Sequence, residues 1–279
     1  IRRQRQMCIR DSNWTVCEGK NAGKANATTD AEQALKEAEA KHKKKLEAGY
    51  HLNVDNISKK RFYEPMLAQD FKNKNRQKEV MGEIGSEADN TTGYGAAVFS
   101  QPKLDGIRCI AMREGLFTRT GKPITAVPHI HEELNPFFEE YPNATLDGEL
   151  YNHAYKDDFN KIIHLVRKQN LTFEHLEHSK SMIQYHIYDA PVIGQSVVGG
   201  KCWTEKDSFS DRTSIIDAQF NNLGLLTLEE RGETQSLVVV ETTQVGSREH
   251  LDELYGGYVE HGYEGQMIRL DGPYENKRS

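Results

Sequence analysis

Short apolar runs rich in β-branched and aromatic residues alternate with segments of helical periodicity over most of the chain. The apolar runs predict strands at 97–102, 106–113, 116–120, 145–151, 184–189, 237–242 and 266–270. The periodic segments predict helices at 128–140, 157–168, 211–222 and 247–261, and in the second of these one apolar face contains Phe159, Ile162, Ile163 and Val166. Adjacent strands punctuated by helices predict an α+β domain of mixed, largely antiparallel sheets flanked by helices.

A strongly helix-prone stretch, AEQALKEAEAKHKKKL, occupies residues 31–46. Thr28 or Thr29 precedes it as an N-cap, and Gly49 follows it as a stop signal. The lysine-rich segment 41–45 makes the end of this helix basic. A solvated helix whose charges suit the helix dipole is the favoured interpretation, and a phosphate-contacting patch is the alternative.

The sequence predicts three parts. Residues 1–12 lack an initiating Met and any periodicity, and we interpret them as a non-native or unstructured leader. Residues 13–60 predict a small strand-plus-helix module, and residues 61–279 the main domain. Within the main domain, the polar and Gly-rich segment 71–94 predicts a loop or linker. Because the chain stops just after a strand-like run and a Gly-Pro turn, we expect it to be a fragment.

Composition narrows the class of protein. With 279 residues, 37% hydrophobic and 28% charged, the chain suits a globular protein, and no apolar run is long enough to cross a bilayer. The net charge of −6 means that a nucleic acid would need a local basic patch. The four cysteines are widely spaced and predict the reduced thiols of an intracellular protein; they are Cys8, Cys17, Cys109 and Cys202.

One stretch, QPKLDGIR at 101–108, places a lysine at the bend between two predicted strands. Burial there would disfavour the charged form of Lys103, and Arg108 would act in the same direction by repulsion. A neutral amine is a nucleophile, so the arrangement suits covalent catalysis. The alternative is a lysine that reaches solvent from a hairpin turn supplied by Asp105-Gly106.

Further motifs follow in order along the chain. They are Thr118-Arg119-Thr120-Gly121-Lys122, Leu146-Asp147-Gly148-Glu149-Leu150, Tyr185-His186-Ile187-Tyr188-Asp189, Glu264-Gly265-Gln266-Met267-Ile268-Arg269 and Lys277-Arg278-Ser279. Together with Lys103 they resemble the collinear motifs of the covalent nucleotidyltransferases, and within that superfamily the ATP-dependent DNA ligases of the tailed-phage type. The resemblance spans residues 64–279. Each motif alone is weak, and their order and spacing make the signal specific.

The resemblance implies a nucleotidyltransferase fold and an adenylation reaction. Lys103 would attack the α-phosphate of ATP, forming a lysyl-AMP phosphoramidate and releasing pyrophosphate. Glu149 and Glu264 would lie near the nucleotide and serve Mg²⁺ and the ribose, since Mg²⁺ takes few carboxylates together with phosphate oxygens. Tyr188 would stack on adenine.

Other positions carry weaker implications. Arg108 would contact the nucleotide sugar and Arg119 the 5′-phosphate at a nick, where a guanidinium can bind bidentately. Gln101 would contact the adenine edge. For Gln101, Asp147 and Arg269 a purely structural role is as well supported as a functional one. Edge-strand acids, a core tyrosine and a surface arginine are the corresponding structural interpretations for Glu149, Glu264, Tyr188 and Arg119.

The chain also departs from the family pattern. The last motif normally continues beyond Lys277-Arg278-Ser279 to two phosphate-binding lysines, and an oligonucleotide-binding (OB-fold) domain then follows. Both are absent from this sequence, so we expect adenylation to be impaired and to recover when that segment is restored. The segment from Trp14 to Tyr50 loosely resembles a WGR-type module, which favours DNA as a partner.

Three functions therefore remain open. The resemblance favours a DNA ligase that seals nicked double-stranded DNA and acts as a monomer inside a host or bacterial cell, and its phage-type character favours a viral gene. An RNA ligase or an mRNA-capping guanylyltransferase would share the same motifs. A non-catalytic DNA-binding adaptor would keep the scaffold, and its DNA affinity would not depend on Lys103.

Overall fold

The computed structural model describes residues 15–47, 50, 63–84, 97–194, 203–225 and 236–275. The chain separates into two compact units, Ile1–Arg61 and Phe62–Ser279. Several sequence predictions fall outside the described residues, namely the leader at 1–12, Trp14, Cys8, Cys202 and the final motif at 277–279.

In the first unit the predicted helix forms as α2 (Asp30–Glu47). The Glu32 carboxylate accepts a hydrogen bond from the backbone N–H of Thr29 (2.8 Å), and the Thr29 hydroxyl accepts one from the N–H of Glu32 (3.3 Å). This reciprocal pair is a capping box, which satisfies backbone donors at the start of a helix and identifies Thr29 as the N-cap. Most side chains of α2 are exposed, as a solvated helix requires. The strand-plus-helix module itself stays a prediction.

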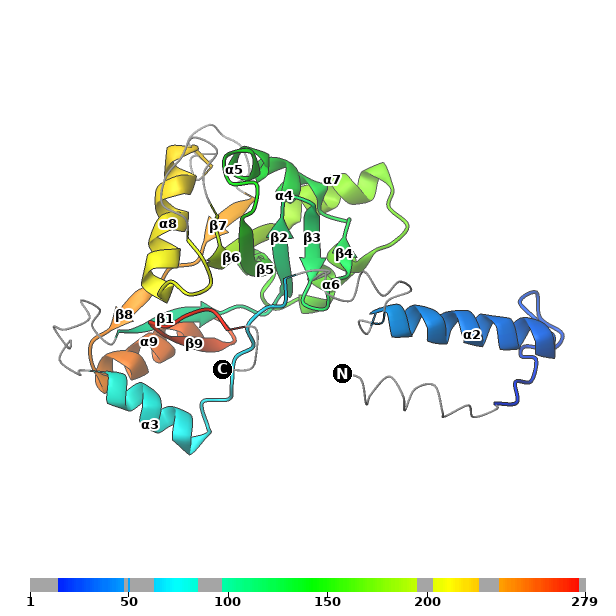
Figure 1. The fold of residues 1–279 in the computed structure, drawn as a ribbon, viewed down its shortest axis with the longest axis horizontal. Coiled ribbons are helices and arrows are strands. Elements are labelled where there is room, and N and C mark those ends of the chain that lie inside the picture. The colour runs from blue at the N-terminus through cyan, green and yellow to red at the C-terminus, as the bar shows by residue number, and fades with distance from the viewer. Residues whose placement is uncertain are drawn as a thin grey trace. The chain divides into compact units, whose positions relative to one another are not determined.

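The second unit is built on two sheets, of which the larger has the strand order β4-β3-β2-β5-β6-β7 (Figure 1). The bounds are β2 (Ile107–Met112), β3 (Gly115–Thr118), β4 (Pro123–Ile124), β5 (Thr145–Tyr151), β6 (Gln184–Val192) and β7 (Leu237–Val239). Every neighbouring pair is antiparallel except β6 and β7, which run parallel. The predicted mixed and largely antiparallel architecture is confirmed.

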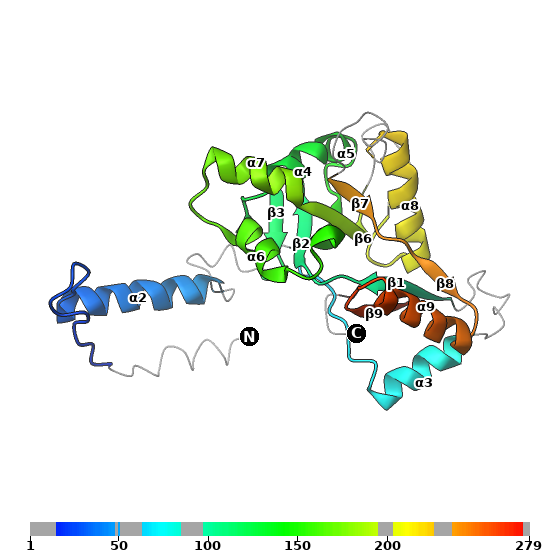
Figure 2. The same cartoon turned by 180° about the vertical axis from the view of Figure 1, so that it is seen from behind.

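The smaller sheet has the antiparallel order β8-β1-β9. It consists of β1 (Val98–Lys103), β8 (Thr243–Val245) and β9 (Gly265–Leu270). Helix α9 (Arg248–Glu260) lies against β1 and β9, as the view from behind makes plain (Figure 2). This sheet has its own small core, which contains Val80, Val98, Val245 and Leu251.

Helices cover the larger sheet and complete the main core. Helix α8 (Phe209–Asn222) packs against β6, and α6 (Phe159–Arg167) packs against β2 and β5. The short 3₁₀ helix η2 (His153–Tyr155) follows β5. None of the helices in the described part of the chain combines the length and apolarity needed to cross a bilayer.

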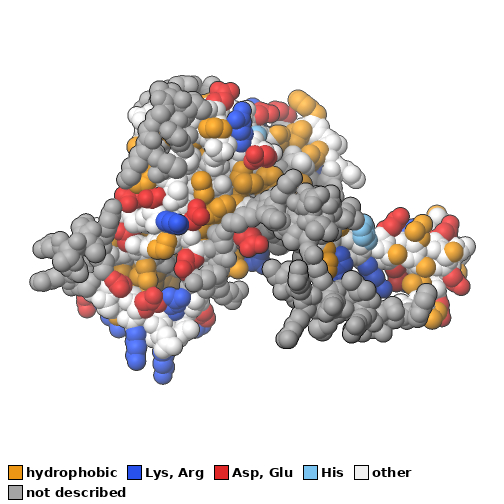
Figure 3. Space-filling model, viewed as in Figure 1, with side chains coloured by type: hydrophobic (Ala, Val, Ile, Leu, Met, Phe, Trp, Pro, Cys, Tyr) orange, Lys and Arg blue, Asp and Glu red, His pale blue; other side chains and the backbone are white. Residues whose placement is uncertain are grey.

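Three sequence predictions about helices need correction. Part of the predicted loop at 71–94 is a helix, α3 (Lys74–Glu83), which the Asn73 side chain caps. It was missed because Val80 is its only buried residue, so it has no apolar stripe to recognise. The lysines of α3 are exposed, and basic side chains project at the lower end of the space-filling view (Figure 3). Helix α7 (Phe173–Met182) was missed because its apolar periodicity is equally weak.

The predicted helix at 128–140 is two helices, α4 (Pro128–Glu133) and α5 (Asn135–Glu140). Pro136 has no backbone N–H to donate to the carbonyl of Glu132, and its ring obstructs a continuous helix at this point. The chain therefore breaks at Leu134, which is fully buried between the two pieces.

Among the described residues Cys17 and Cys109 carry free thiols, and the reduced state of the whole chain stays a prediction. Cys109 is fully buried in β2, and burial raises the pKa of its thiol well above the usual range. It therefore behaves as a small apolar core residue.

Phe137→Ala should destabilise the second unit by about 3–5 kcal/mol, because it leaves a cavity among packed rings. Phe137 is fully buried, and its ring lies within 5.1 to 5.6 Å of those of Phe138, Tyr141 and Phe220. Phe173 is 79% exposed, so Phe173→Ala should change little. Urea unfolding of both variants measures the difference, and equal losses would contradict this packing.

Candidate functional site

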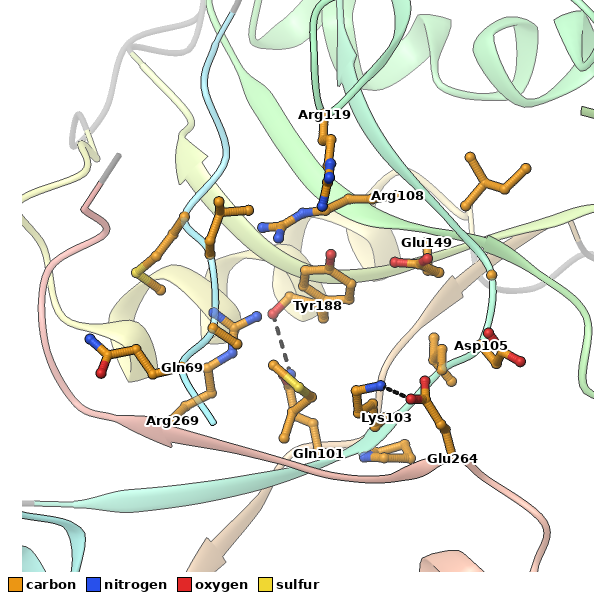
Figure 4. A pocket seen from close by; sticks show the side chains of 18 of the residues that line it. Gln69, Gln101, Lys103, Asp105, Arg108, Arg119, Glu149, Tyr188, Glu264 and Arg269 are labelled. Carbon is orange, nitrogen blue, oxygen red and sulfur yellow. Dashed lines mark hydrogen bonds and ion pairs between the residues drawn. The ribbon is translucent and has the colours of Figure 1, made fainter. Parts of the chain in front are cut away.

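A cleft of about 1680 Å³ lies within the second unit and is lined by residues of both sheets. Strands β1 and β9 supply one wall, and β2, β3, β5 and β6 supply the other (Figure 4). Most of the residues singled out from the sequence line this single cleft, namely Gln101, Lys103, Arg108, Arg119, Glu149, Tyr188, Glu264 and Arg269. Segments that lie far apart in the sequence therefore meet here.

Lys103 is the last residue of β1, and its ammonium group forms an ion pair with the carboxylate of Glu264 (Figure 4). The backbone reinforces this pair, since the N–H of Glu264 donates to the carbonyl of Lys103 (3.1 Å). The Lys103 side chain is 40% exposed, so the expectation of a desolvated lysine is wrong. A carboxylate, rather than an apolar wall, holds the amine in the cleft.

The bend after Lys103 is not a hairpin turn. Strand β1 belongs to the smaller sheet and β2 to the larger one, so 104–106 carries the chain from one sheet to the other. Gly106 lies so close to β5 that a Cβ would come within 2.5 Å of the Leu150 carbonyl oxygen and 2.7 Å of the Glu149 Cγ. The glycine lets the crossing pack tightly, which brings Lys103 beside the residues of β5.

Arg108 is held by Asp147, which lies on the neighbouring strand β5. Two hydrogen bonds join the guanidinium to the carboxylate, at 2.9 and 2.6 Å. Asp147 is fully buried and also accepts a hydrogen bond from the Tyr274 hydroxyl (2.6 Å), which in turn accepts one from the backbone N–H of Met66 (2.8 Å). Asp147 does not line the cleft. Of the two roles left open for it, the structure supports the positioning of Arg108.

Glu149 lies further along β5 than Asp147 and faces the cleft. Burial raises the pKa of this carboxyl to about 8, with Asp147 and Asp105 adding to the effect and Arg108 and Lys103 opposing it. A nearby cation would favour the charged form of Glu149. Such a carboxyl group suits a site that binds a cation or a phosphate-bound cation. It does not fit the alternative interpretation of Glu149 as a solvated acid on an edge strand.

Tyr188 presents its ring to the cleft from β6, and the guanidinium carbons of Arg108 and Arg269 lie 5.7 and 5.3 Å from its centroid. Gln101 is almost fully buried, and its amide donates to the carbonyl of Tyr188 (3.2 Å) and to the Thr242 hydroxyl (2.8 Å). Gln101 thus fixes the strand that carries the aromatic ring, and its side-chain oxygen keeps its acceptor capacity.

Arg119 lies in the turn between β3 and β4, and its side chain points toward the cleft beside Arg108 (Figure 4). It is exposed and forms no ion pair with any side chain in the described part of the chain. The structural interpretation, in which a surface carboxylate neutralises this arginine, has no support from the described residues.

Two features of the cleft were missed from the sequence. The segment 66–71 crosses it and adds Met66, Leu67 and Gln69 to its lining. Arg212 of α8 is buried and forms two hydrogen bonds with Asp189 (2.8 and 3.0 Å), a carboxylate that also lies 3.8 Å from Arg269. Neither feature has a periodic pattern, and the apolar run PMLA at 65–68 was the only available signal.

Lys156 and His153 hold the loop between α9 and Glu264 in place through contacts with its backbone. The Lys156 ammonium donates to the carbonyl of His261 (2.8 Å), and the same carbonyl lies 3.0 Å from His153 Nε2. Gly262, with φ at 85°, lies directly against the end of the Lys156 side chain. The loop after α9 is therefore fixed to the segment that follows β5, just before the carboxylate that contacts Lys103.

The carboxylates that line the cleft are of the kind that binds Mg²⁺. Within the described residues no group of three or more His, Cys, Asp or Glu side chains could enclose a metal by itself. Glu149 and Glu264 line the same cleft as Lys103, and Asp105 lines it as well. Mg²⁺ is usually held by one or two carboxylates with substrate phosphates and water, so two glutamates at an open cleft fit that ion.

Comparison with solved structures identifies the class of protein to which this fold belongs. The fold is that of a nucleotidyltransferase domain, and solved ligases share it. The bacteriophage T7 ATP-dependent DNA ligase in complex with ATP has a TM-score of 0.53 at 17% identity, over 77% of this chain and 66% of that one. A structure from a study of Lig E DNA ligases has a TM-score of 0.50 at 22% identity, over 78% and 66%.

The family follows from the sequence match. Residues 65–279 match the model of the ATP-dependent DNA ligase domain, and the chain belongs to that family. The DNA ligase of African swine fever virus, Warthog isolate, is 26% identical over 277 residues, which is 96% of this chain and 55% of the relative. The ligase of the Badajoz 1971 Vero-adapted strain matches to the same extent. The chain thus spans about half the length of the curated relatives it matches.

Glu149→Gln should remove a pH-dependent loss of stability. As the pH rises from about 4.5 to about 8, the unfolded chain loses the Glu149 proton while the folded chain retains it, so folding stability falls across this window. Glutamine has no such proton. The melting temperatures of the variant and the wild type are measured in buffer that contains a metal chelator. The variant's melting temperature minus that of the wild type should increase between pH about 5 and pH about 8.

Glu253 provides the matched control for this change, because it is an exposed glutamate on α9 outside the cleft. Glu253→Gln should leave the difference constant with pH. A Glu149→Gln difference that is equally constant would show that the carboxyl is not held in its protonated form.

Gly262→Ala should destabilise the chain by about 1–3 kcal/mol, because the residue has a positive φ that an alanine adopts only with strain. A Cβ on Gly256, in the interior of α9, would meet no neighbouring atom within 4 Å. Gly256→Ala should instead stabilise by about 0.5–1 kcal/mol, since alanine favours a helix. Thermal unfolding measures both variants. Changes of melting temperature in opposite directions would establish the backbone constraint at Gly262, and changes in the same direction would refute it.

Proposed function

We propose that this chain forms the nucleotidyl-transfer centre of an ATP-dependent DNA ligase and that Lys103 is its nucleophile. The observation that carries the proposal is the ion pair between Lys103 and Glu264, located where the chain crosses from one sheet to the other. Around this pair the cleft holds an acid, a clamped arginine and an aromatic ring from three different strands, Glu149, Arg108 and Tyr188. Family membership supports the same activity.

The first step is attack of Lys103 on the α-phosphorus of ATP. The amine must first lose a proton, which passes to water, and the Glu264 carboxylate that contacts the amine holds it in the cleft. The nitrogen–phosphorus bond then forms while the bond from phosphorus to the pyrophosphate oxygen breaks, giving lysyl-AMP and pyrophosphate. The reaction gathers negative charge on phosphate oxygens, so a cation placed beside them would stabilise it.

The nucleotide is held by the side chains around Lys103. Tyr188 stacks on the adenine, and the free acceptor oxygen of Gln101 takes a hydrogen bond from the base edge. Arg108 contacts the sugar. Mg²⁺, held by Glu149 and Glu264, would neutralise charge on the phosphates. Glu149 faces the same cleft as Glu264, and a nearby cation would favour its charged carboxylate.

The later steps act on nicked double-stranded DNA. AMP passes from Lys103 to the 5′-phosphate of the nick, which Arg119 contacts, and the 3′-hydroxyl then attacks that phosphate and releases AMP. We infer a monomer that works inside a host or bacterial cell in DNA replication, repair and recombination. The viral origin of the matching ligases supports a viral source.

Covalent labelling tests the assignment of Lys103. The chain is incubated with Mg²⁺ and ATP labelled at the α-phosphate, denatured, and examined for bound label. Lys103→Ala should abolish the label, because the variant lacks the nucleophilic amine. Lys180 is an exposed lysine of α7 outside the cleft, so Lys180→Ala should retain it.

Two results would contradict the proposal. One is label that persists in Lys103→Ala, and the other is a wild-type chain without label both alone and fused to the C-terminal segment of a related ligase. GTP in place of ATP, and nicked RNA in place of nicked DNA, separate the capping and RNA-ligase alternatives. DNA affinity that survives Lys103→Ala with no nucleotide effect on stability would indicate the adaptor.

A further inference from the structure

Tyr274 lies where two distant segments of the second unit meet. Its hydroxyl donates to the Asp147 carboxylate (2.6 Å) and accepts the backbone N–H of Met66 (2.8 Å). Tyr274 is 2% exposed, and burial raises the pKa of its hydroxyl well above the ordinary value, so the group keeps the proton that it donates. One hydroxyl thus joins the segment before β1, the segment after β9 and strand β5.

The rest of Tyr274 is held by residues in and just before α8. Its backbone N–H donates to the carbonyl of Glu205 (2.7 Å), and Arg212 donates to the carbonyl of Gly272 (3.1 Å). The guanidinium carbon of Arg212, a buried residue, lies 5.7 Å from the centroid of the Tyr274 ring. Because these contacts fix the backbone and the ring, the hydroxyl is a fixed point to which Met66 is attached.

We call the attached segment, 66–71, the strap, and all of its residues line the cleft. At one end Met66 is attached to Tyr274, and through it to β5 of the larger sheet. At the other end Phe71 packs against the small core of the sheet β8-β1-β9. The strap therefore runs from one sheet to the other along the cleft between them.

The strap is remote from the amine that reacts. In Figure 4, Gln69 of the strap lies with Arg269 on one side of Tyr188, and Lys103 and Asp105 lie on the other side. Gln69 and Tyr188 line the same cleft, and Tyr188 is the ring to which the proposed function assigns the adenine. Displacement of the strap should therefore alter the space for the base and leave the reacting amine in place.

We propose that Tyr274 is a positioning residue for the nucleotide, and that its hydroxyl holds the strap against the cleft. The proposal rests on the proposed function, which places the base on Tyr188. Without the hydroxyl the Met66 N–H loses its acceptor, so the strap would spend part of its time away from the cleft. A site whose binding-competent state is only partly populated binds its ligand more weakly by that fraction. Asp147 keeps its two hydrogen bonds with Arg108, so the arginine stays in place.

A purely structural role for this hydroxyl makes a different prediction, and Tyr185 provides the comparison. The Tyr185 hydroxyl is also buried, and it donates to the backbone carbonyl of Cys109 (3.1 Å). Tyr185 does not line the cleft. Loss of either hydroxyl should lower the melting temperature, because each leaves a buried group without its partner. Only the hydroxyl of Tyr274 should also affect how the nucleotide binds.

The first measurement is the affinity of the chain for α,β-methylene-ATP, an analogue that cannot release pyrophosphate. Tyr274→Phe keeps the ring and removes the hydroxyl, so it should weaken binding by about two- to tenfold, the range for one lost hydrogen bond. Tyr185→Phe should bind the analogue as the wild type does. At saturating ATP labelled at the α-phosphate, Tyr274→Phe should label at the wild-type rate, because the strap carries no reacting group.

The second measurement is hydrogen exchange at the Met66 amide, which reports the strap directly. Tyr274→Phe should exchange faster there than the wild type, because the amide has lost its acceptor. Tyr185→Phe should exchange at the wild-type rate. The analogue should slow this exchange in the wild type, since it binds the form in which the strap is closed.

Wild-type affinity for the analogue in Tyr274→Phe would overturn the proposal, as would an equal loss in Tyr185→Phe, unchanged exchange at Met66 or a wild-type chain that does not bind the analogue. Failure of the proposed function has a different result, namely no labelled chain either alone or fused to the C-terminal segment. Weaker binding by Tyr274→Phe in a chain that takes no label would keep the role of Tyr274 and refute the chemistry at Lys103.

Discussion

The crossing of the chain between its two sheets, at 104–106, sets the geometry of the site. Backbone hydrogen bonds fix β1 in one sheet and β2 in the other, so the chain changes partners within this short segment. Gly106 permits this because its backbone rests directly on β5, where no side chain would fit. As a result Lys103, Glu149 and Glu264 face one cleft. A looser crossing would separate the amine from the acids that surround it.

Buried charge gives the cleft its rigidity. The Arg108–Asp147 and Arg212–Asp189 pairs lie largely out of solvent, where removal of one partner would leave an unpaired charge at high cost. Asp147 also receives the hydroxyl of Tyr274, and through it the backbone of Met66. One carboxylate thus connects an arginine of the cleft, the segment that crosses it and the segment near position 274. We infer that this network fixes how Arg108 and the two segments are arranged, and that it adds little to the free energy of unfolding.

The cleft combines opposite charges without mixing them. Near Lys103, burial raises the pKa of Glu149 to about 8, so the site gains from a cation. Further along, the basic residues of the β3–β4 turn and of α6 form a separate part of the lining.

The sequence alone predicted most of the elements, and it predicted residues that the structure brings together in one cleft. The strand at 145–151 is predicted to the residue, although Asp147, Gly148 and Glu149 interrupt its apolar residues. The order of the motifs indicated which side chains would converge, and every residue predicted to catalyse, bind the nucleotide or contact the 5′-phosphate lines the cleft. Polar helices such as α3 escaped prediction because they bury almost nothing.

Only the tertiary structure decided which strands pair. Backbone donors and acceptors are the same for nearly every residue, so local pattern predicts a strand but does not select its partner. For this reason the sequence suggested a buried lysine in a turn, whereas the structure places Lys103 at a crossing and pairs it with Glu264. The role of Asp147 was open for the same reason, since its partners are 39 and 127 positions away.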